Sequence, residues 1–232
     1  MLYQRYFKNG QRLLLRTLSP IPEGQTHLLS AYMEGGEKDT FILSLPYSED
    51  AATQYTFAPG MTFEISSDTL GLGIRATASF SHKVDSQRIA LHIRKDLQMF
   101  QRRAAPRLDC NLGIRFTRGQ GALKALRATW EKNVQVLNSP GAPLNLQGFQ
   151  PCQVNLSCGG IRFRLRPPVN LSELCLMLIQ LDDGMLPICT LAEVLWTRPE
   201  QEDTVIVSGM RFINILEADQ KRIEKLVRGN KS

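Results

Sequence analysis

Residues 155–163 read Asn155-Leu156-Ser157-Cys158-Gly159-Gly160-Ile161-Arg162-Phe163, and this stretch decides how the second half of the chain is interpreted. Asn, Ser and Gly are ordinary turn residues, and β-favouring apolar residues stand on both sides of them. We therefore predict a turn between two strands, at 150–156 and 160–165. The same stretch follows the pattern Asp/Asn-x-Ser-x-x-Gly.

Further strand-like segments recur on both sides of this turn. We predict them at 110–116, 174–181, 188–197 and 205–213. The chain then changes to a helical pattern over 217–228, where Ile223, Leu226 and Val227 recur at helical spacing. The second half is thus predicted to be a set of short strands followed by a C-terminal amphipathic helix.

The first half also reads as short strands, over about residues 25–93. The stretch 34–37 is a turn signal, Pro46 closes one strand, and 61–66 alternates with a period of two. Such spacing predicts a small antiparallel barrel or sandwich. Residues 3–18 mix apolar and basic residues and fit either a helix or an extra strand.

Two segments break the strand pattern. Residues 94–107 carry five cations, and Pro106 argues against a continuing helix, so we predict a domain junction that ends in an extended arm. Residues 117–148 read as an irregular insertion, with a short helix around 122–130 and a loop signal at 138–143.

The amino-acid composition limits the classes of protein to which the chain can belong. A hydrophobic share of 43% in 232 residues is enough for folded cores, and the formal net charge of +6 favours an anionic partner. Five cysteines form no metal-like pair, so we expect reduced thiols in a cytoplasmic protein and no zinc site or disulfide scaffold. No stretch approaches the roughly 20 apolar residues that span a bilayer.

Two motifs in the second half carry the candidate chemistry: Arg103-Ala104-Ala105-Pro106-Arg107, which Arg102 precedes, and the turn at 155–160. Guanidinium groups pair with phosphate or with the Hoogsteen edge of guanine, and they stack on purines. Glycines let a backbone approach closely and present its amides. Taken alone, the arginine motif fits a basic linker and the second motif fits an ordinary turn. Taken together, they suit the binding of a cyclic dinucleotide.

With both motifs in this order, the sequence resembles a PilZ domain, in which an arginine arm precedes a six-stranded barrel. The resemblance covers 98–232 and extends to Ala192-Glu193-Val194-Leu195-Trp196 and Gly209-Met210-Arg211-Phe212. Residues 20–97 resemble the N-terminal barrel of flagellar-brake-type PilZ proteins. The resemblance implies a mainly β chain: one small antiparallel barrel in domain 1–97, and a PilZ barrel with a C-terminal helix in domain 98–232, its arm at 98–107.

The resemblance also implies a ligand, cyclic-di-GMP, and the residues that bind it. Arg103 and Arg107 would grip guanine and phosphate groups, while Asn155, Ser157, Gly159 and Gly160 would line the barrel side of the site. Arg102 lies outside the minimal motif; because a third guanidinium can stack on an extra guanine, a single ligand and a stacked ligand dimer both stay open. Asn155 stands where the family often has Asp, which removes a charge and keeps an acceptor. We expect Trp196 in the barrel core rather than beside the ligand.

Other classes of function have less support. The sequence contains no nucleophile elbow, P-loop or zinc-protease motif, so no catalytic residue, metal or cofactor is expected. Asp182-Asp183-Gly184 reads as a hairpin turn. A basic nucleic-acid-binding module is the serious alternative, although the strands show no row of aromatics for base stacking. A PilZ adaptor that binds proteins without ligand is the third.

The function expected from the sequence is therefore a cyclic-di-GMP receptor, not an enzyme. Ligand would bridge the arm and the second barrel and change the arrangement of the two domains. The output would pass to a protein partner, in the flagellar motor or other envelope machinery, and the N-terminal resemblance favours motility.

Overall fold

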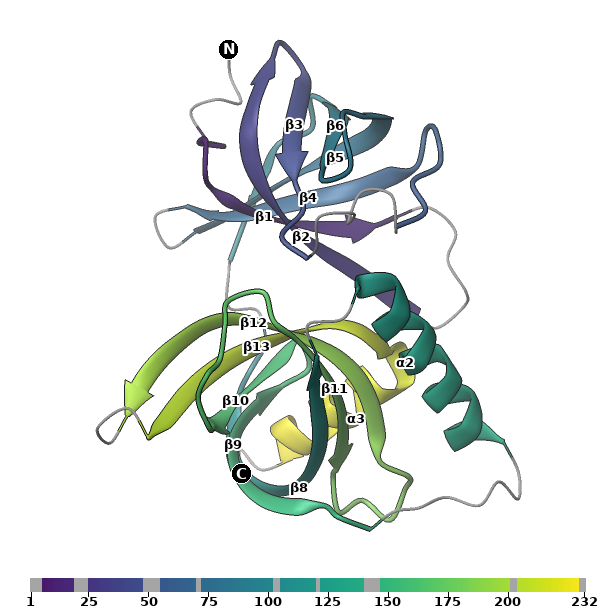
Figure 1. The fold of residues 1–232 in the computed structure, drawn as a ribbon, viewed down its shortest axis with the longest axis vertical. Coiled ribbons are helices and arrows are strands. Elements are labelled where there is room, and N and C mark those ends of the chain that lie inside the picture. Colours follow the sequence, from purple (N-terminus) through teal and green to yellow (C-terminus); the bar gives the residue numbers. More distant parts are fainter. Residues whose placement is uncertain are drawn as a thin grey trace. The chain divides into compact units, whose positions relative to one another are not determined.

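The chain forms two compact units, Met1–Ala104 and Ala105–Ser232 (Figure 1). The computed structural model describes residues 6–18, 25–47, 55–69, 72–101, 105–119, 122–139, 147–200 and 204–229. The sequence placed the domain boundary between residues 97 and 98, seven residues before the division between the units. Residues 98–100 lie with the first unit because they form a short strand on its barrel.

Six strands close the first barrel. They are β1 (Arg12–Thr17), β2 (Gln25–Glu37), β3 (Thr40–Ser44), β4 (Thr62–Thr69), β5 (Leu72–Lys83) and β6 (Arg88–Ile93). The ring runs β1-β4-β5-β6-β3-β2 and returns to β1, with every neighbouring pair antiparallel. A seventh strand, β7 (Gln98–Phe100), pairs with β5.

The segment that the sequence left open, 3–18, contains strand β1. Leu13 and Leu15 are buried, and the residues between and beside them are more exposed. This alternation with period two is what a strand on a barrel wall requires, since successive side chains point to opposite faces. A barrel in the first half, rather than a sandwich, follows from the closed ring of strands.

The second unit is also a closed six-stranded antiparallel barrel. Its strands are β8 (Leu108–Gly119), β9 (Gln150–Ser157), β10 (Gly160–Leu165), β11 (Leu174–Gln180), β12 (Ile188–Glu200) and β13 (Val205–Leu216), in the ring order β8-β9-β10-β13-β12-β11. Helix α3 (Glu217–Gly229) follows and buries Ile223 and Val227 in the same core. The predicted mainly β class with a C-terminal helix is confirmed.

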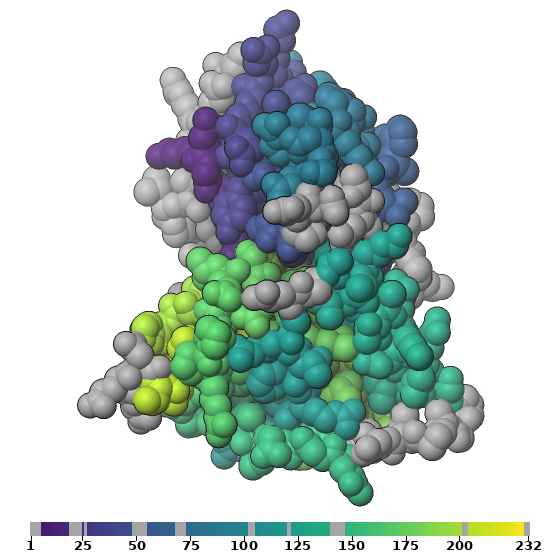
Figure 2. Space-filling view, viewed as in Figure 1, coloured from purple at the N-terminus to yellow at the C-terminus, as the bar shows by residue number. Residues whose placement is uncertain are grey.

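The insertion after β8 is more ordered than predicted. Residues 117–119 complete β8, and helix α2 (Leu123–Asn138) is 16 residues long, so the prediction of an irregular segment with a helix at 122–130 was wrong in extent. No Pro or Gly interrupts 123–138, and packing of Trp130 and Arg127 on the barrel holds the helix. Its outer side lies at the surface (Figure 2). Residues 140–143 of the predicted loop lie outside the described part of the chain.

The acidic turn and the cysteines behave as structural residues. Asp183 lies in the connection between the antiparallel strands β11 and β12 and forms an ion pair with Arg222 of α3 at 2.9 Å, which confirms the hairpin. All five cysteines are free thiols, and Cys175 and Cys189 are buried in the second barrel. In the described residues, no helix is long and apolar enough to cross a membrane.

Candidate functional site

One row of side chains crosses the outer face of the second barrel. Cross-strand partners in register place Asp109 (β8) opposite Asn155 (β9), Asn155 opposite Arg162 (β10), Arg162 opposite Gly209 (β13), and Gly209 opposite Trp196 (β12). Directly opposite residues share a face of the sheet. We call these five residues the cross-strand row. It brings the first residue of the turn motif beside an arginine that follows the motif.

A second set of polar side chains lies beside the cross-strand row. Arg164 is opposite Val207, and Val207 is opposite Arg198. Arg164 donates from Nη1 to Gln153 Oε1 at 3.1 Å and pairs through Nε with Glu200 Oε2 at 2.6 Å. Strands β9, β10 and β12 therefore contribute cations, an amide and a carboxylate to the same face.

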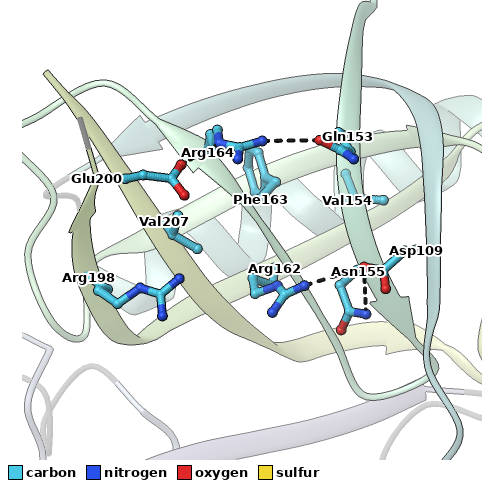
Figure 3. Close-up of a pocket in the computed structure, with 10 residues that line it drawn as sticks. All are labelled: Asp109, Gln153, Val154, Asn155, Arg162, Phe163, Arg164, Arg198, Glu200 and Val207. Atoms are coloured by element: carbon cyan, nitrogen blue, oxygen red, sulfur yellow. Dashed lines mark hydrogen bonds and ion pairs between the residues drawn. The ribbon is translucent and has the colours of Figure 1, made fainter.

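Asp109, Asn155 and Arg162 of the cross-strand row, together with the second set, line one pocket with a volume of about 220 Å³. Figure 3 shows Asp109 and Asn155 on one side of it, Glu200 and Arg198 on the other, and Arg162 and Arg164 between them. The lining residues are Asp109, Gln153, Val154, Asn155, Arg162, Phe163, Arg164, Arg198, Glu200 and Val207. Seven of its ten lining residues are polar or charged.

Asn155 and Arg107, both predicted as site residues, are brought together here. Arg107 Nη1 donates to Asn155 Oδ1 at 3.3 Å, and Asn155 Nδ2 donates to Asp109 Oδ1 at 2.9 Å. The same Asp109 oxygen accepts from Arg162 Nη2 at 3.3 Å. A hydrogen-bonded chain thus runs from the end of the arm to the middle of the pocket. Arg102 and Arg103 lie outside the described residues.

Ser157, Gly159 and Gly160 form the β9–β10 turn beside the pocket, and none of them is among its described lining residues. Ser157 is buried, and its Oγ donates to Gly160 O at 3.2 Å. A Cβ on Gly160 would lie 2.2 Å from Met210 O, so β13 approaches too closely for a side chain. Gly159 O accepts from Phe212 N at 3.1 Å. These contacts hold Asn155 in register.

Trp196 lies on the outside of the barrel, so the expectation that it fills the core was wrong. Its residue surface is 41% exposed, and its indole lies over Gly209, where a Cβ would be 2.2 Å from the ring. The register of β12 on β13 shifts between Val194 and Trp196, which re-aims the side chains beyond the shift. The buried tryptophan is Trp130 of α2, whose Nε1 donates to Cys189 O of β12.

Four charged residues of the pocket were not predicted from the sequence: Asp109, Arg164, Arg198 and Glu200. Arg162 follows the turn motif directly, but no role was predicted for it. The spacing of Arg162 and Arg164 on one strand was the available signal, since residues two apart share a face with the cross-strand partner Asn155. Arg198 and Glu200 repeat this spacing on β12.

Positive charge dominates the pocket. The lining holds three guanidinium groups, of Arg162, Arg164 and Arg198, and two carboxylates, of Asp109 and Glu200. Arg107, which contacts Asn155 beside the pocket, brings the surplus to two positive charges. The hydrogen bond from Arg164 lowers the pKa of Glu200, and the same bond raises that of the guanidinium, so both are charged at neutral pH. Arg198 has no ion pair within the described residues. The arrangement suits an anion, and no group of three His, Cys, Asp or Glu in the described part could hold a metal.

A barrel closed by a C-terminal helix, with arginines before and beside its turn motif, agrees with the family comparison. The PilZ domain model matches residues 101–229, and the chain belongs to that family. No curated protein matches the sequence.

Solved structures of low identity cover nearly the whole chain. The Bacillus subtilis inhibitor of motility MotI/DgrA is 15% identical, with 97% of this chain and 98% of that one covered and a TM-score of 0.38. The K. pneumonia MrkH–c-di-GMP complex is 15% identical, with 95% and 87% covered and a TM-score of 0.35. Escherichia coli YcgR in complex with c-di-GMP is 13% identical, with 96% and 84% covered and a TM-score of 0.35.

Proposed function

We propose that this PilZ-domain protein is a receptor for cyclic-di-GMP and that the ligand binds in the pocket on the outer face of the second barrel. The observation that carries the proposal is the cross-strand row, which sets Asn155 of the turn motif between Arg107 and Arg162. The surplus of two positive charges matches the two phosphodiester groups of a cyclic dinucleotide, because opposite charges attract strongly where the ligand excludes water.

Each part of the pocket has a matching part of the ligand. Arginines can pair with phosphate oxygens in two-point fashion or with O6 and N7 of guanine. Arg164 and Arg198 on the barrel, with Arg107 and the motif arginines Arg102 and Arg103 on the arm, are the proposed partners. The exposed indole of Trp196 at the end of the row offers a flat apolar face for a purine.

The proposed mechanism is ligand-driven ordering. Cyclic-di-GMP held by both the arm and the barrel would favour one arrangement of the two units over others, and a ligand shifts such an equilibrium by its difference in affinity for the two states. The favoured arrangement would expose or hide a surface for a protein partner that governs motility or a related surface behaviour. We place this receptor in the cytoplasm, where its free thiols stay reduced.

A thermal-shift experiment with three additives separates this function from its alternatives. Cyclic-di-GMP at about 100 times its Kd is expected to stabilise the folded chain by about 2.7 kcal/mol, which raises the melting temperature by several degrees. Cyclic-di-AMP and duplex DNA are expected to give little shift. A shift with arbitrary DNA that disappears steeply with salt would favour a nucleic-acid module instead.

Two variants localise the effect. Arg164→Ala removes a pocket guanidinium and is expected to weaken binding at least tenfold, because a two-point contact is lost. Arg88→Ala removes an equally exposed guanidinium in the first barrel, where Arg88 pairs with Asp85, and should leave the shift unchanged. Equal shifts for both variants and the parent would place the ligand elsewhere.

A further inference from the structure

We propose that Asp109 reads the guanine base of the ligand, by accepting hydrogen bonds from the N1–H and the 2-amino group on its Watson–Crick edge. In this role Asp109 supplies, from the neighbouring strand β8, the carboxylate that the turn motif lacks at Asn155. The inference rests on the proposed function and deepens it, because it names the residue that distinguishes guanine from other purines.

Asp109 is positioned and oriented by its neighbours on the barrel. It is the cross-strand partner of Asn155, and its Oδ1 accepts from both Asn155 Nδ2 and Arg162 Nη2. These two donors hold the carboxylate on the side of the pocket opposite Glu200 and Arg198 (Figure 3). Its side chain is 72% exposed, so the group is oriented by its neighbours and still open to a ligand. Within the described residues Oδ2 accepts no hydrogen bond.

Asn155 is unsuited to the same task. Its Oδ1 accepts from Arg107 Nη1 and its Nδ2 donates to Asp109, so both ends of the amide are oriented by protein partners. The Watson–Crick edge of guanine presents two adjacent donors, N1–H and the 2-amino group. A carboxylate can accept from both, whereas an amide offers one acceptor and one donor. The amide at the motif position therefore fixes Asp109 and Arg107, and the carboxylate one strand away faces the base.

Glu200, the other carboxylate of the pocket, is already engaged. Its Oε2 pairs with Arg164 Nε at 2.6 Å, and it lies on the opposite side from Asp109 (Figure 3). It thus provides a matched control: the same change from carboxylate to amide, in the same pocket, at a residue with a different expected role.

The test compares cyclic-di-GMP with its inosine counterpart, cyclic-di-IMP, by isothermal titration. The two ligands share phosphates, N1–H and the Hoogsteen edge and differ only in the 2-amino group. The parent protein is expected to bind cyclic-di-GMP about tenfold more tightly, the discrimination typical of a good two-point contact to a base. Asp109→Asn is expected to reduce this ratio to within about twofold. Glu200→Gln is expected to change both affinities together and keep the ratio.

A second variant tests whether a carboxylate at position 155 can replace the one at Asp109. Adding Asn155→Asp to Asp109→Asn returns a carboxylate to the adjacent strand and is expected to restore the preference for guanine. Circular dichroism melting verifies that each variant is folded. A folded Asp109→Asn protein that keeps the parent's ratio, or a parent that binds both ligands equally, overturns the inference while the receptor function stands. A folded parent that binds neither ligand overturns the function itself.

Discussion

At the scale of single residues, the turn beside the pocket depends on one close backbone contact. Gly160→Ala would place a Cβ 2.2 Å from Met210 O on β13, whereas Gly159→Ala would meet nothing within 4 Å. We expect the first change to lower the free energy of unfolding by about 1–3 kcal/mol, since a backbone atom must move, and the second to change it by less than about 0.5 kcal/mol. Thermal or urea unfolding measures both. Equal effects would mean that the approach of β13 is not what requires glycine at 160.

The buried thiols give a second prediction at this scale. Burial raises the pKa of Cys175 and of Cys189 to about 12, and burial alone raises that of Cys152 to a lesser degree. Because the thiolate is the reactive form, the native protein at pH 8 should resist alkylation at Cys175 and Cys189. Mass spectrometry after iodoacetamide treatment, with and without denaturant, reads this out. Labelling of Cys175 in the folded protein as fast as Cys152 would contradict it.

Residue roles at the pocket were only partly predictable. Arg107 and Asn155 could be named because their spacing matches a motif. Arg198 and Trp196 could not, because strand β12 shifts its register on β13 between Val194 and Trp196, and sequence alternation does not reveal where such a shift falls. The sequence offered one local indication: Gly209 stands within a strand, and a glycine there is compatible with a large ring, here that of Trp196, lying across it.

At the scale of elements, α2 is held to the second barrel by a few buried side chains. Trp130 is fully buried, and its Nε1 donates to Cys189 O at 3.0 Å, while Arg127 Nε donates to Asn214 Oδ1 at 3.0 Å. These contacts join the insertion to strands β12 and β13. The helix is thus a fixed part of the second unit.

Truncating this anchor is expected to be costly. Trp130→Ala should lower the free energy of unfolding by about 3–5 kcal/mol, the usual effect of removing a buried aromatic side chain. Val136→Ala, on the exposed side of the same helix, is the control and should change it by less than about 0.5 kcal/mol. Chemical denaturation followed by circular dichroism compares them. If Trp130→Ala is as stable as the control, α2 does not contribute to the barrel's stability.

Strands were predicted more closely than the insertion helix. Strand β10 was predicted at its observed bounds and α3 to within one residue, since alternating or amphipathic apolar residues mark both. In α2 the residues after Trp130 are mostly polar, so periodicity fades although the helix continues to Asn138. The contacts of Trp130 and Arg127 with the barrel are tertiary interactions, which the periodicity of the sequence does not reveal.

At the scale of the whole molecule, the arm is anchored at both of its ends. On one side β7 pairs with β5 of the first barrel, and the ring of Phe100 lies against Gly73 with the Arg75 guanidinium 5.8 Å from its centroid. On the other side Arg107 contacts Asn155 of the second barrel. A ligand that binds residues of the arm would therefore act on the segment of chain that joins the two units.

Small-angle X-ray scattering tests the consequence for the whole chain. Saturation with cyclic-di-GMP is expected to change the pair-distance distribution of the parent protein, because one arrangement of the units becomes favoured. The Arg103→Ala/Arg107→Ala double variant should give the same curve with and without ligand. Identical curves for the free and the saturated parent would show that binding does not rearrange the units.

Isothermal titration measures most directly whether cyclic-di-GMP binds this chain through the arginine arm and the pocket. We expect saturable binding to the parent protein and its loss in the Arg103→Ala/Arg107→Ala variant. Two ligands per chain would agree with a role of Arg102 in supporting a stacked dimer, and one per chain would exclude that role. A folded parent protein that gives no heat of binding on titration with cyclic-di-GMP would contradict this prediction.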